Sequence, residues 1–175
     1  MLCLSPSFAI IPLLMAMKNY TADIEMNKIF TELQNTLGTH GAKQISFDYD
    51  NDGRIQSVQF VIKANDRFIP VRLPARVAQA QAVLKRQWEA GVISHKRGKE
   101  KTYGYEQAYC VAWRNILDWV QAQMALIEIE MTKLEEVFLP YMIAKSGKTY
   151  FETLENRQFQ LESGTRAQED EVIHL

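Results

Sequence analysis

The sequence predicts an α+β protein in which a three-stranded antiparallel β-meander packs against a long apolar α-helix, flanked by shorter helices. Three observations support this fold class. Apolar and polar residues alternate through 44–74, which is the period of half-buried strands. Segment 105–139 instead repeats apolar residues every three or four positions, with no Gly or Pro, as a helix does. Residues 22–37 and 75–90 show the same helical period over shorter lengths.

The helices predicted at 22–37 and 75–90 have recognisable ends. Thr21 or Asp23 can cap the start of the first, and Gly38 stands where a left-handed C-terminal residue belongs. Gly91 is expected to end the second. The apolar stripes comprise Met26, Ile29, Phe30, Leu33 and Leu37 in the first helix, and Val77, Ala80, Leu84 and Trp88 in the second. We expect both stripes to pack on the rest of the domain.

Three strands are predicted between these helices, at 44–50, 54–64 and 65–74. Alternate residues in each strand are apolar, so one face of the sheet should be buried. Pro70 has no N–H to donate, which predicts that the third strand lies at an edge of the sheet. The residues expected on the buried face are Ile45, Phe47, Tyr49, Val58, Phe60, Ile62, Ile69, Val71 and Leu73.

The connection between the first two strands, DYDNDG at 48–53, also resembles the start of a calcium-binding loop. Such a loop needs a bidentate Glu six residues after its Gly and a helix on each side. Position 59 is Gln, and the flanking segments have the period of strands. We therefore expect a turn formed by Asn51, Asp52 and Gly53, with a weak surface site for a divalent ion as the alternative.

The long apolar segment 105–139 is compatible with one continuous helix or with two helices joined by a bend. Thr132 followed by Glu135 resembles a capping box that would restart a helix, and Pro140 marks an end or a kink. The main seam comprises Cys110, Trp113, Leu117, Val120, Met124, Ile127, Met131, Leu134 and Phe138, and a second row comprises Ala112, Ile116, Trp119, Leu126 and Ile129. This apolar face is expected to cover the sheet or to contact another protein or a second copy of the chain. A short helix should follow at 149–159.

The first 16 residues are apolar and carry no charge, unlike the rest of the chain. One interpretation is a signal peptide, although a basic n-region is missing and Pro12 interrupts the apolar run. A second is an upstream mis-start, with Met17 as the natural first residue. A third is a short element that packs on the domain. We place the single domain at 17–160 and a polar tail at 161–175.

The composition excludes strong global attraction to other molecules. Hydrophobic residues make up 47% of the 175 positions and charged residues 23%, as in ordinary globular proteins. The net charge of −1 means that binding to nucleic acid requires a local patch. Two cysteines form a poor disulfide framework, which favours a cytoplasmic setting. No apolar run reaches the roughly 18 residues of a membrane span, so no membrane partner is expected.

No segment carries a complete catalytic, cofactor or metal motif, so we assign no residues to these roles and favour a non-enzymatic function. SGKT at 146–149 lacks the earlier Gly of a phosphate-binding loop, because that position is Met142. Cys110 lies on the apolar seam, which favours a core residue over a reactive thiolate. The acidic residues expected on the solvated face of the long helix are Glu128, Glu130, Glu135 and Glu136.

The strongest functional signal is the basic segment 85–101 together with the tyrosines that follow it. Lys and Arg neutralise phosphates, and aromatic rings stack on bases. The candidate nucleic-acid-binding residues are Lys85, Arg86, Lys96, Arg97, Lys99, Lys101, Tyr103 and Tyr105. The alternative is a solvated loop whose charges keep the protein soluble.

Three stretches carry a resemblance to known proteins: AWRNILDWVQAQMALIEIEMTKLEEVFLPYM at 112–142, FDYDNDGRIQSVQFVI at 47–62 and IPVRLPARV at 69–77. With them the chain resembles, over residues 40–155, a group of small proteins of phages, prophages and mobile elements. The resemblance implies a prokaryotic or viral cytosolic setting, often near genes concerned with DNA, and favours Met17 as the start. It implies no catalytic residues. The expected partners are therefore the nucleic-acid backbone or, alternatively, a host protein or a second copy.

Overall fold

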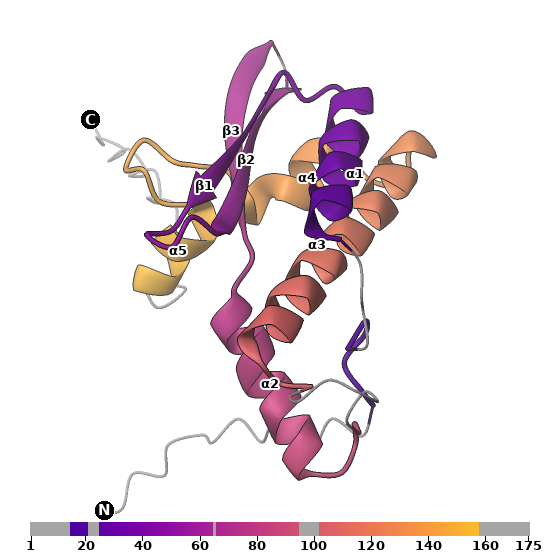
Figure 1. Cartoon of the computed structure of the whole chain (residues 1–175). Coiled ribbons are helices and arrows are strands. Elements are labelled where there is room, and N and C mark those ends of the chain that lie inside the picture. Colours follow the sequence, from indigo (N-terminus) through magenta and orange to yellow (C-terminus); the bar gives the residue numbers. More distant parts are fainter. Residues whose placement is uncertain (1–14, 21–24, 65, 95–101, 158–175) are drawn as a thin grey trace, which may run out of the picture.

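The computed structural model describes residues 15–20, 25–64, 66–94 and 102–157. They form an α+β fold with an antiparallel sheet of order β1-β2-β3, so the predicted fold class is confirmed. The elements are α1 (Met26–Thr39), β1 (Gln44–Tyr49), β2 (Ile55–Ala64), β3 (Arg67–Pro74), α2 (Val77–Glu89), α3 (Tyr105–Glu128), α4 (Leu134–Phe138), the 3-10 helix η1 (Leu139–Tyr141) and α5 (Tyr150–Asn156). Figure 1 shows the sheet, α1 and α4 at one end of the molecule and α2 at the other, with α3 extending between them.

The sheet buries the face that the alternation predicts, except at one residue. Five of the predicted inward residues are fully buried: Val58, Phe60, Ile62, Val71 and Leu73. Tyr49 was expected beside them, but 63% of it is exposed. The register shifts between Asp48 and Tyr49, so that Tyr49 lies opposite Ile55. This irregularity redirects the end of β1, which alternation along a single strand cannot reveal.

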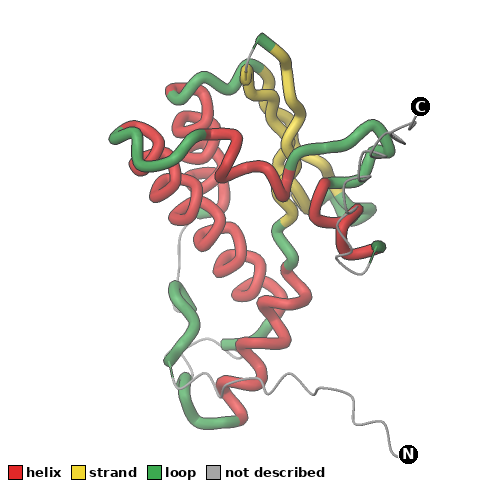
Figure 2. Tube along the Cα trace, turned by 180° about the vertical axis from the view of Figure 1, so that it is seen from behind, coloured by secondary structure: helices red, strands yellow, loops and turns green. Residues whose placement is uncertain are grey.

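The two sides of the sheet are covered differently. Helices α1, α3 and α4 lie on the apolar side, and α5 lies on the other side, as seen from behind in Figure 2. Arg72 points to the α5 side and forms an ion pair with Glu152 at 3.0 Å. Pro70 lies in β3, which is an edge strand as predicted, and its carbonyl accepts a hydrogen bond from the Ile143 backbone N–H. The chain after η1 therefore closes part of the β3 edge.

The connection at 48–53 is a turn, as predicted. The Asp50 carboxylate accepts hydrogen bonds from the backbone N–H groups of Asp52 and Arg54, at 2.9 and 2.8 Å. Gly53 has a φ of 75°, which suits glycine. Asp48 is used elsewhere, because its carboxylate accepts hydrogen bonds from Ser57 and Gln59 on β2. Two of the three aspartates are therefore committed to the protein's own donors.

Side chains of α3 hold the start of β2 by its backbone. The Tyr109 hydroxyl accepts a hydrogen bond from the Ile55 N–H at 3.0 Å. The Trp113 indole N–H donates to the Ile55 carbonyl at 3.3 Å. Both aromatic residues are buried, and the Trp113 ring also contacts Phe30 of α1 edge-to-face. These contacts fix the helix against the sheet at one residue.

The predicted long helix is divided into two. Helix α3 ends at Glu128, and Glu130 adopts a left-handed φ of 58°. The N–H groups of Glu130 and Met131 donate to the carbonyls of Ile127 and Leu126, which is a Schellman motif. Of the two alternatives, the continuous helix is therefore wrong. Helix α4 restarts near the predicted point, but the capping carboxylate belongs to Glu136, not Glu135, and accepts from the Lys133 N–H.

The break determines which part of the apolar face is buried. Five consecutive members of the main seam are buried: Cys110, Trp113, Leu117, Val120 and Met124. Beyond Glu128 the helical spacing no longer applies, and Met131 and Ile129 are 72% and 63% exposed. The predicted solvated acidic face is also divided, because Glu130 lies in the break and Glu135 and Glu136 lie in α4.

The ends of the shorter helices differ from the prediction in detail. Helix α1 begins at Met26, later than expected, and the proposed caps at 21–24 lie outside the described residues. Gly38 belongs to the helix, and Gly41 takes the left-handed conformation with a φ of 93°. Gly91 follows α2 with a φ of 69°, as predicted. The carbonyls at the end of α1 are satisfied partly by the N–H groups of His40 and Gly41, which explains the later stop.

The SGKT segment forms a tight loop and a helix cap. Gly147 has a φ of 77°, and the backbone N–H of Ala144 donates to the Lys148 carbonyl. Thr149 and Glu152 form a capping box at the start of α5, with reciprocal hydrogen bonds of 3.1 and 2.7 Å. The polar residues of the segment thus have a local structural role.

Candidate nucleic-acid interface

The described part of the basic segment lies in the last turns of α2. Lys85 and Arg86 are both exposed there. Lys85 has a loose contact of 3.9 Å with Glu89, in which both side chains are mostly exposed. Arg86 has no acidic partner among the residues that the structure describes. Two cations at this end of the molecule are thus available to an external anion.

The other four basic residues of the prediction, Lys96, Arg97, Lys99 and Lys101, lie outside the described residues. The two ends of their segment are held together, because the Thr102 hydroxyl donates to the Ser94 carbonyl at 3.2 Å. Thr102 is 3% exposed. Ser94 and Thr102, which stand on either side of residues 95–101 in the sequence, therefore lie close together between α2 and the start of α3.

Charge is strongly segregated along the chain. Residues 77–104 contain six Lys or Arg and two Glu, a net charge of +4. The remaining positions contain 14 basic and 19 acidic residues, a net charge of −5. The overall charge of −1 therefore conceals a basic segment in an otherwise acidic chain, and we call the end of α2 that carries Lys85 and Arg86 the basic end. Such an asymmetry favours one orientation toward a polyanion.

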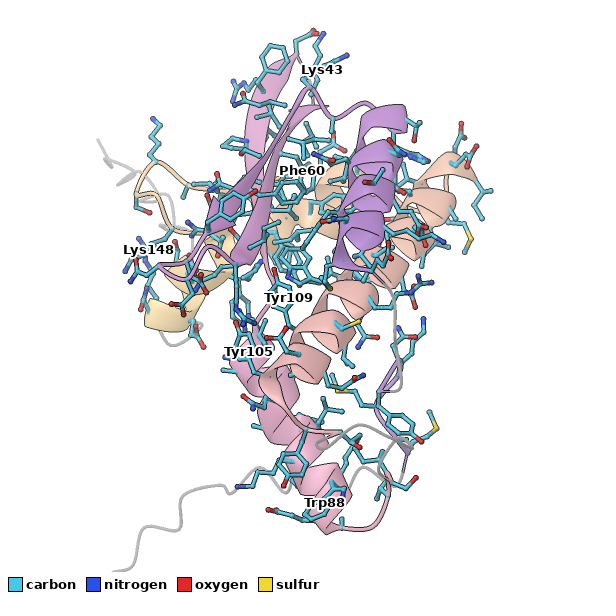
Figure 3. All side chains as sticks on the ribbon, in the orientation of Figure 1. Lys43, Phe60, Trp88, Tyr105, Tyr109 and Lys148 are labelled. Carbon is cyan, nitrogen blue, oxygen red and sulfur yellow. The ribbon has the colours of Figure 1, made fainter. Side chains whose placement is uncertain are left out.

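The structure separates the two predicted tyrosines. Tyr103 packs against Trp88, with ring centroids 5.0 Å apart. Tyr105 lies closer to the sheet, where the Arg54 guanidinium sits 4.5 Å above its ring and Tyr109 stacks on it. Figure 3 shows Trp88 at the α2 end and Tyr105 near Tyr109. Tyr103 therefore accompanies the basic end, whereas Tyr105 belongs to the contact between α3 and the first hairpin.

Trp88 is an aromatic residue of this end, and the helical period predicts it only as part of the apolar stripe of α2. It is partly exposed and lies three and two positions after Lys85 and Arg86. On a helix this spacing brings Trp88 and Lys85 to one face. The adjacency of cations and a tryptophan was therefore visible in the sequence, but the helical period alone favoured a core position.

The N-terminal residues 15–20 contact both α2 and α3 near the basic end. The Gln87 side chain, buried in α2, accepts from the Met17 N–H and donates to the Met15 carbonyl. Lys18 forms an ion pair with Asp118 of α3 at 2.8 Å. Burial alone would raise the pKa of Asp118, but hydrogen bonds from Lys18 and Asn19 and the nearby Arg114 charge hold that pKa below its usual value. The Asp118 carboxylate is thus ionised, and its charge is neutralised by Lys18 and Arg114.

Other chemistry has little support in the described part of the chain. There, no three His, Cys, Asp or Glu side chains gather in a way that could hold a metal ion. No helix within the described ranges is long and apolar enough to cross a membrane. The Cys110 side chain is buried in the core, as the seam predicts. No protein-family model, curated protein or solved structure matches the chain.

Proposed function

We propose that the chain binds the nucleic-acid backbone through its basic end and acts without catalysis, as an accessory protein of a phage or mobile element. The observation that carries the proposal is the segregation of charge along the sequence, with +4 in residues 77–104 against −5 elsewhere. Phosphate neutralisation by Lys and Arg releases condensed counterions, and this drives sequence-independent binding. The acidic remainder would be repelled by the same polyanion, so the basic end would face it.

The described residues suggest how the contact would be made. Arg86 presents a guanidinium without an acidic partner among them, and a guanidinium matches the geometry of phosphate oxygens. Lys85 contributes a second cation on the same turn. Trp88 lies on the same helix face as Lys85, with Tyr103 packed against it, and the two rings offer aromatic surface to an unpaired base. This set favours contact with backbone and stacking over reading of base edges.

The test is a titration of labelled duplex and single-stranded DNA, measured by fluorescence anisotropy between about 50 and 200 mM salt. The affinity should fall steeply with salt. The triple variant Lys96→Glu, Arg97→Glu and Lys99→Glu should abolish binding. The double variant Lys85→Glu and Arg86→Glu should weaken it and reduce the salt slope by about 2, since each phosphate contact contributes about 0.9.

A matched control uses two exposed cations at the other end of the molecule. Lys43 precedes β1 and Arg67 begins β3, and both are exposed. The double variant Lys43→Glu and Arg67→Glu changes the net charge by the same amount as the α2 double variant and should retain binding. Binding that survives the triple change, or that falls equally in the control, would remove the proposal. Circular dichroism should show that every variant is folded.

The alternative function, a protein-interaction module that uses the apolar face of the long helix, has a smaller surface to rely on. The chain's own α1, α2, α4 and sheet cover the face from Cys110 to Met124. Among the described residues, the exposed Ile129 and Met131 remain of it at the α3 end, and the partly exposed Ile116 and Trp119 remain near the middle of α3. A molecular mass of twice the monomer in size-exclusion chromatography with light scattering would favour this alternative.

A further inference from the structure

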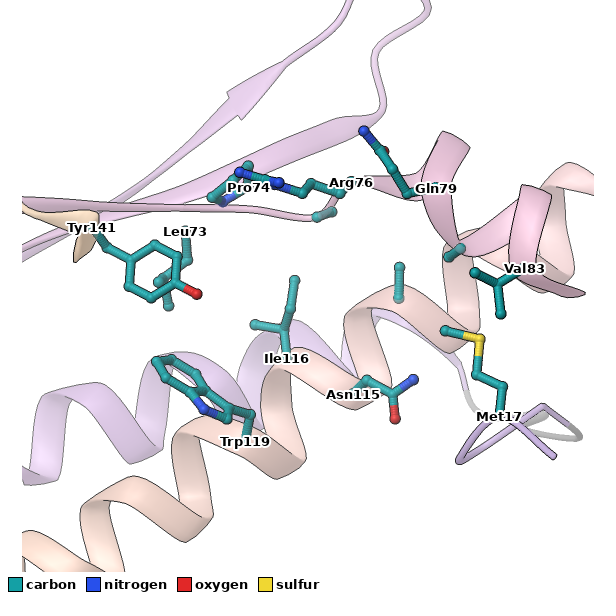
Figure 4. A pocket seen from close by; sticks show the side chains of 13 residues that line it. Met17, Leu73, Pro74, Arg76, Gln79, Val83, Asn115, Ile116, Trp119 and Tyr141 are labelled. Atoms are coloured by element: carbon teal, nitrogen blue, oxygen red, sulfur yellow. The ribbon is translucent and has the colours of Figure 1, made fainter. Parts of the chain in front are cut away.

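A groove lies where the chain passes from β3 into α2. It has a volume of about 390 Å³ and is lined by the end of β3, the first turns of α2, the middle of α3 and η1. Figure 4 shows Leu73, Ile116 and Trp119 forming its apolar walls, with Tyr141 at one end and Met17 at the other. Small-molecule sites typically measure about 300–1,000 Å³, so the volume fits a compact ligand.

The groove is apolar except for a few donors. Arg76 is the one charged residue among those that line it. Figure 4 shows the Arg76 side chain extending beside Pro74 at the rim of the groove, and its guanidinium lies 5.8 Å from the centre of the Phe151 ring. No carboxylate among the described residues pairs with this guanidinium, so it is open to the charged head of a ligand whose body lies in the groove. The Tyr141 hydroxyl points into the groove in Figure 4 and has no hydrogen-bond partner within the described part of the chain. Asp118 of α3 is already bound by Lys18 and Arg114.

This combination selects the charge of a ligand. An apolar body gains free energy by leaving water for the walls formed by Ile116 and Trp119. A carboxylate head gains a charge-assisted hydrogen bond from a guanidinium that has no competing anion. A cationic head would meet Arg76 with repulsion, and a neutral head would gain a weaker hydrogen bond. We propose that the groove binds small amphipathic monoanions, namely carboxylates with an aromatic or short aliphatic body.

The experiment compares three small molecules that share one body: 4-phenylbutyrate, 4-phenylbutan-1-ol and 4-phenylbutylamine. Dissociation constants are measured by NMR titration of the Trp119 indole N–H signal, assigned with Trp119→Phe. The buried Trp113 signal serves as an internal reference. We expect the carboxylate to bind about tenfold more tightly than the alcohol, and the amine to bind most weakly.

Substitutions locate the effect. Arg76→Gln should bring the ratio of carboxylate to alcohol affinity close to one, because the carboxylate loses more affinity than the alcohol. Arg67→Gln, an exposed arginine at the other end of β3, should keep the wild-type ratio. The proposal is overturned by a carboxylate that binds no more tightly than the alcohol, by an unchanged ratio in Arg76→Gln, or by binding that does not shift the Trp119 signal.

Discussion

The hydrogen bond from the Ile55 N–H to the Tyr109 hydroxyl allows a test of how much α3 stabilises the sheet. Tyr109→Phe removes one hydroxyl and leaves the ring in place against Tyr105 and Trp113. The backbone N–H of Ile55, a buried residue at the start of β2, then loses the Tyr109 hydroxyl as its acceptor. Leaving a buried donor unsatisfied costs about 1–3 kcal/mol, so we expect the free energy of unfolding to fall by about 2 kcal/mol. The Trp113 hydrogen bond to the same residue should keep the fold intact.

The assay is urea unfolding followed by circular dichroism, supported by thermal melting. A loss of about 2 kcal/mol corresponds to a Tm lower by about 4–8 °C in a domain of this size. Amide hydrogen exchange at Ile55 should accelerate more than exchange in α2, because the opening is local. Tyr105→Phe is the matched control, since that ring is 39% exposed and its contact with Arg54 is made by the ring face. Equal stability of Tyr109→Phe and wild type would refute the reasoning.

Two further predictions concern a backbone position and a carboxylate. Glu130→Gly should raise the free energy of unfolding by about 0.5–1 kcal/mol in urea titrations, because glycine adopts the left-handed conformation at the end of α3 without strain. Glu128→Gly, in the last helical turn, should lower it by about 1 kcal/mol instead. Hydrogen bonds from Gln59 and Ser57 hold the pKa of Asp48 below its usual value. Ionised Asp48 therefore stabilises the fold above about pH 4, which is the pKa of a free aspartate. This contribution is lost as the pH falls through the pKa of Asp48 in the folded protein. Asp48→Asn should therefore lose less stability than wild type on acidification, and an identical pH profile for the two would contradict this account.

The spacing of apolar residues along the sequence predicted the helices and strands. The prediction failed where the structure depends on contacts that this spacing does not record. The alternation at Val58, Phe60 and Ile62 is enforced by burial of one sheet face, so it could be read from the chain alone. The exposure of Tyr49 could not be predicted, because the register shift depends on how β1 pairs with β2. The sequence left open whether the long helix breaks, because glutamate carries no bias toward the left-handed conformation that Glu130 adopts, and the Schellman hydrogen bonds select it only after the helix has formed.

The candidate sites differ in the same way. The basic end is a property of composition within one segment, so the sequence indicated Lys85 and Arg86 directly. The groove is assembled from β3, α2, α3 and η1, and its polar residues Arg76 and Tyr141 are 65 positions apart in the sequence. No spacing rule links such residues. The separation of Tyr105 from the basic end is likewise a tertiary effect, because Arg54 of the first hairpin holds its ring.

The two proposed sites lie at opposite ends of α2, and this separation makes their tests independent. Arg76 precedes the helix and Lys85 lies nine positions later, which corresponds to about 13 Å along the axis. Charges in water are screened over about 8 Å at physiological ionic strength, so Arg76 adds little to the field at the basic end. Arg76→Gln should therefore leave the salt slope of DNA binding nearly unchanged, and Lys85→Glu with Arg86→Glu should leave the preference for 4-phenylbutyrate nearly unchanged. If Arg76→Gln also weakens DNA binding, or if the Lys85→Glu and Arg86→Glu variant also loses the preference for 4-phenylbutyrate, the α2 surface acts as one continuous anion-binding face. The division into a nucleic-acid-backbone site and a carboxylate groove is then wrong.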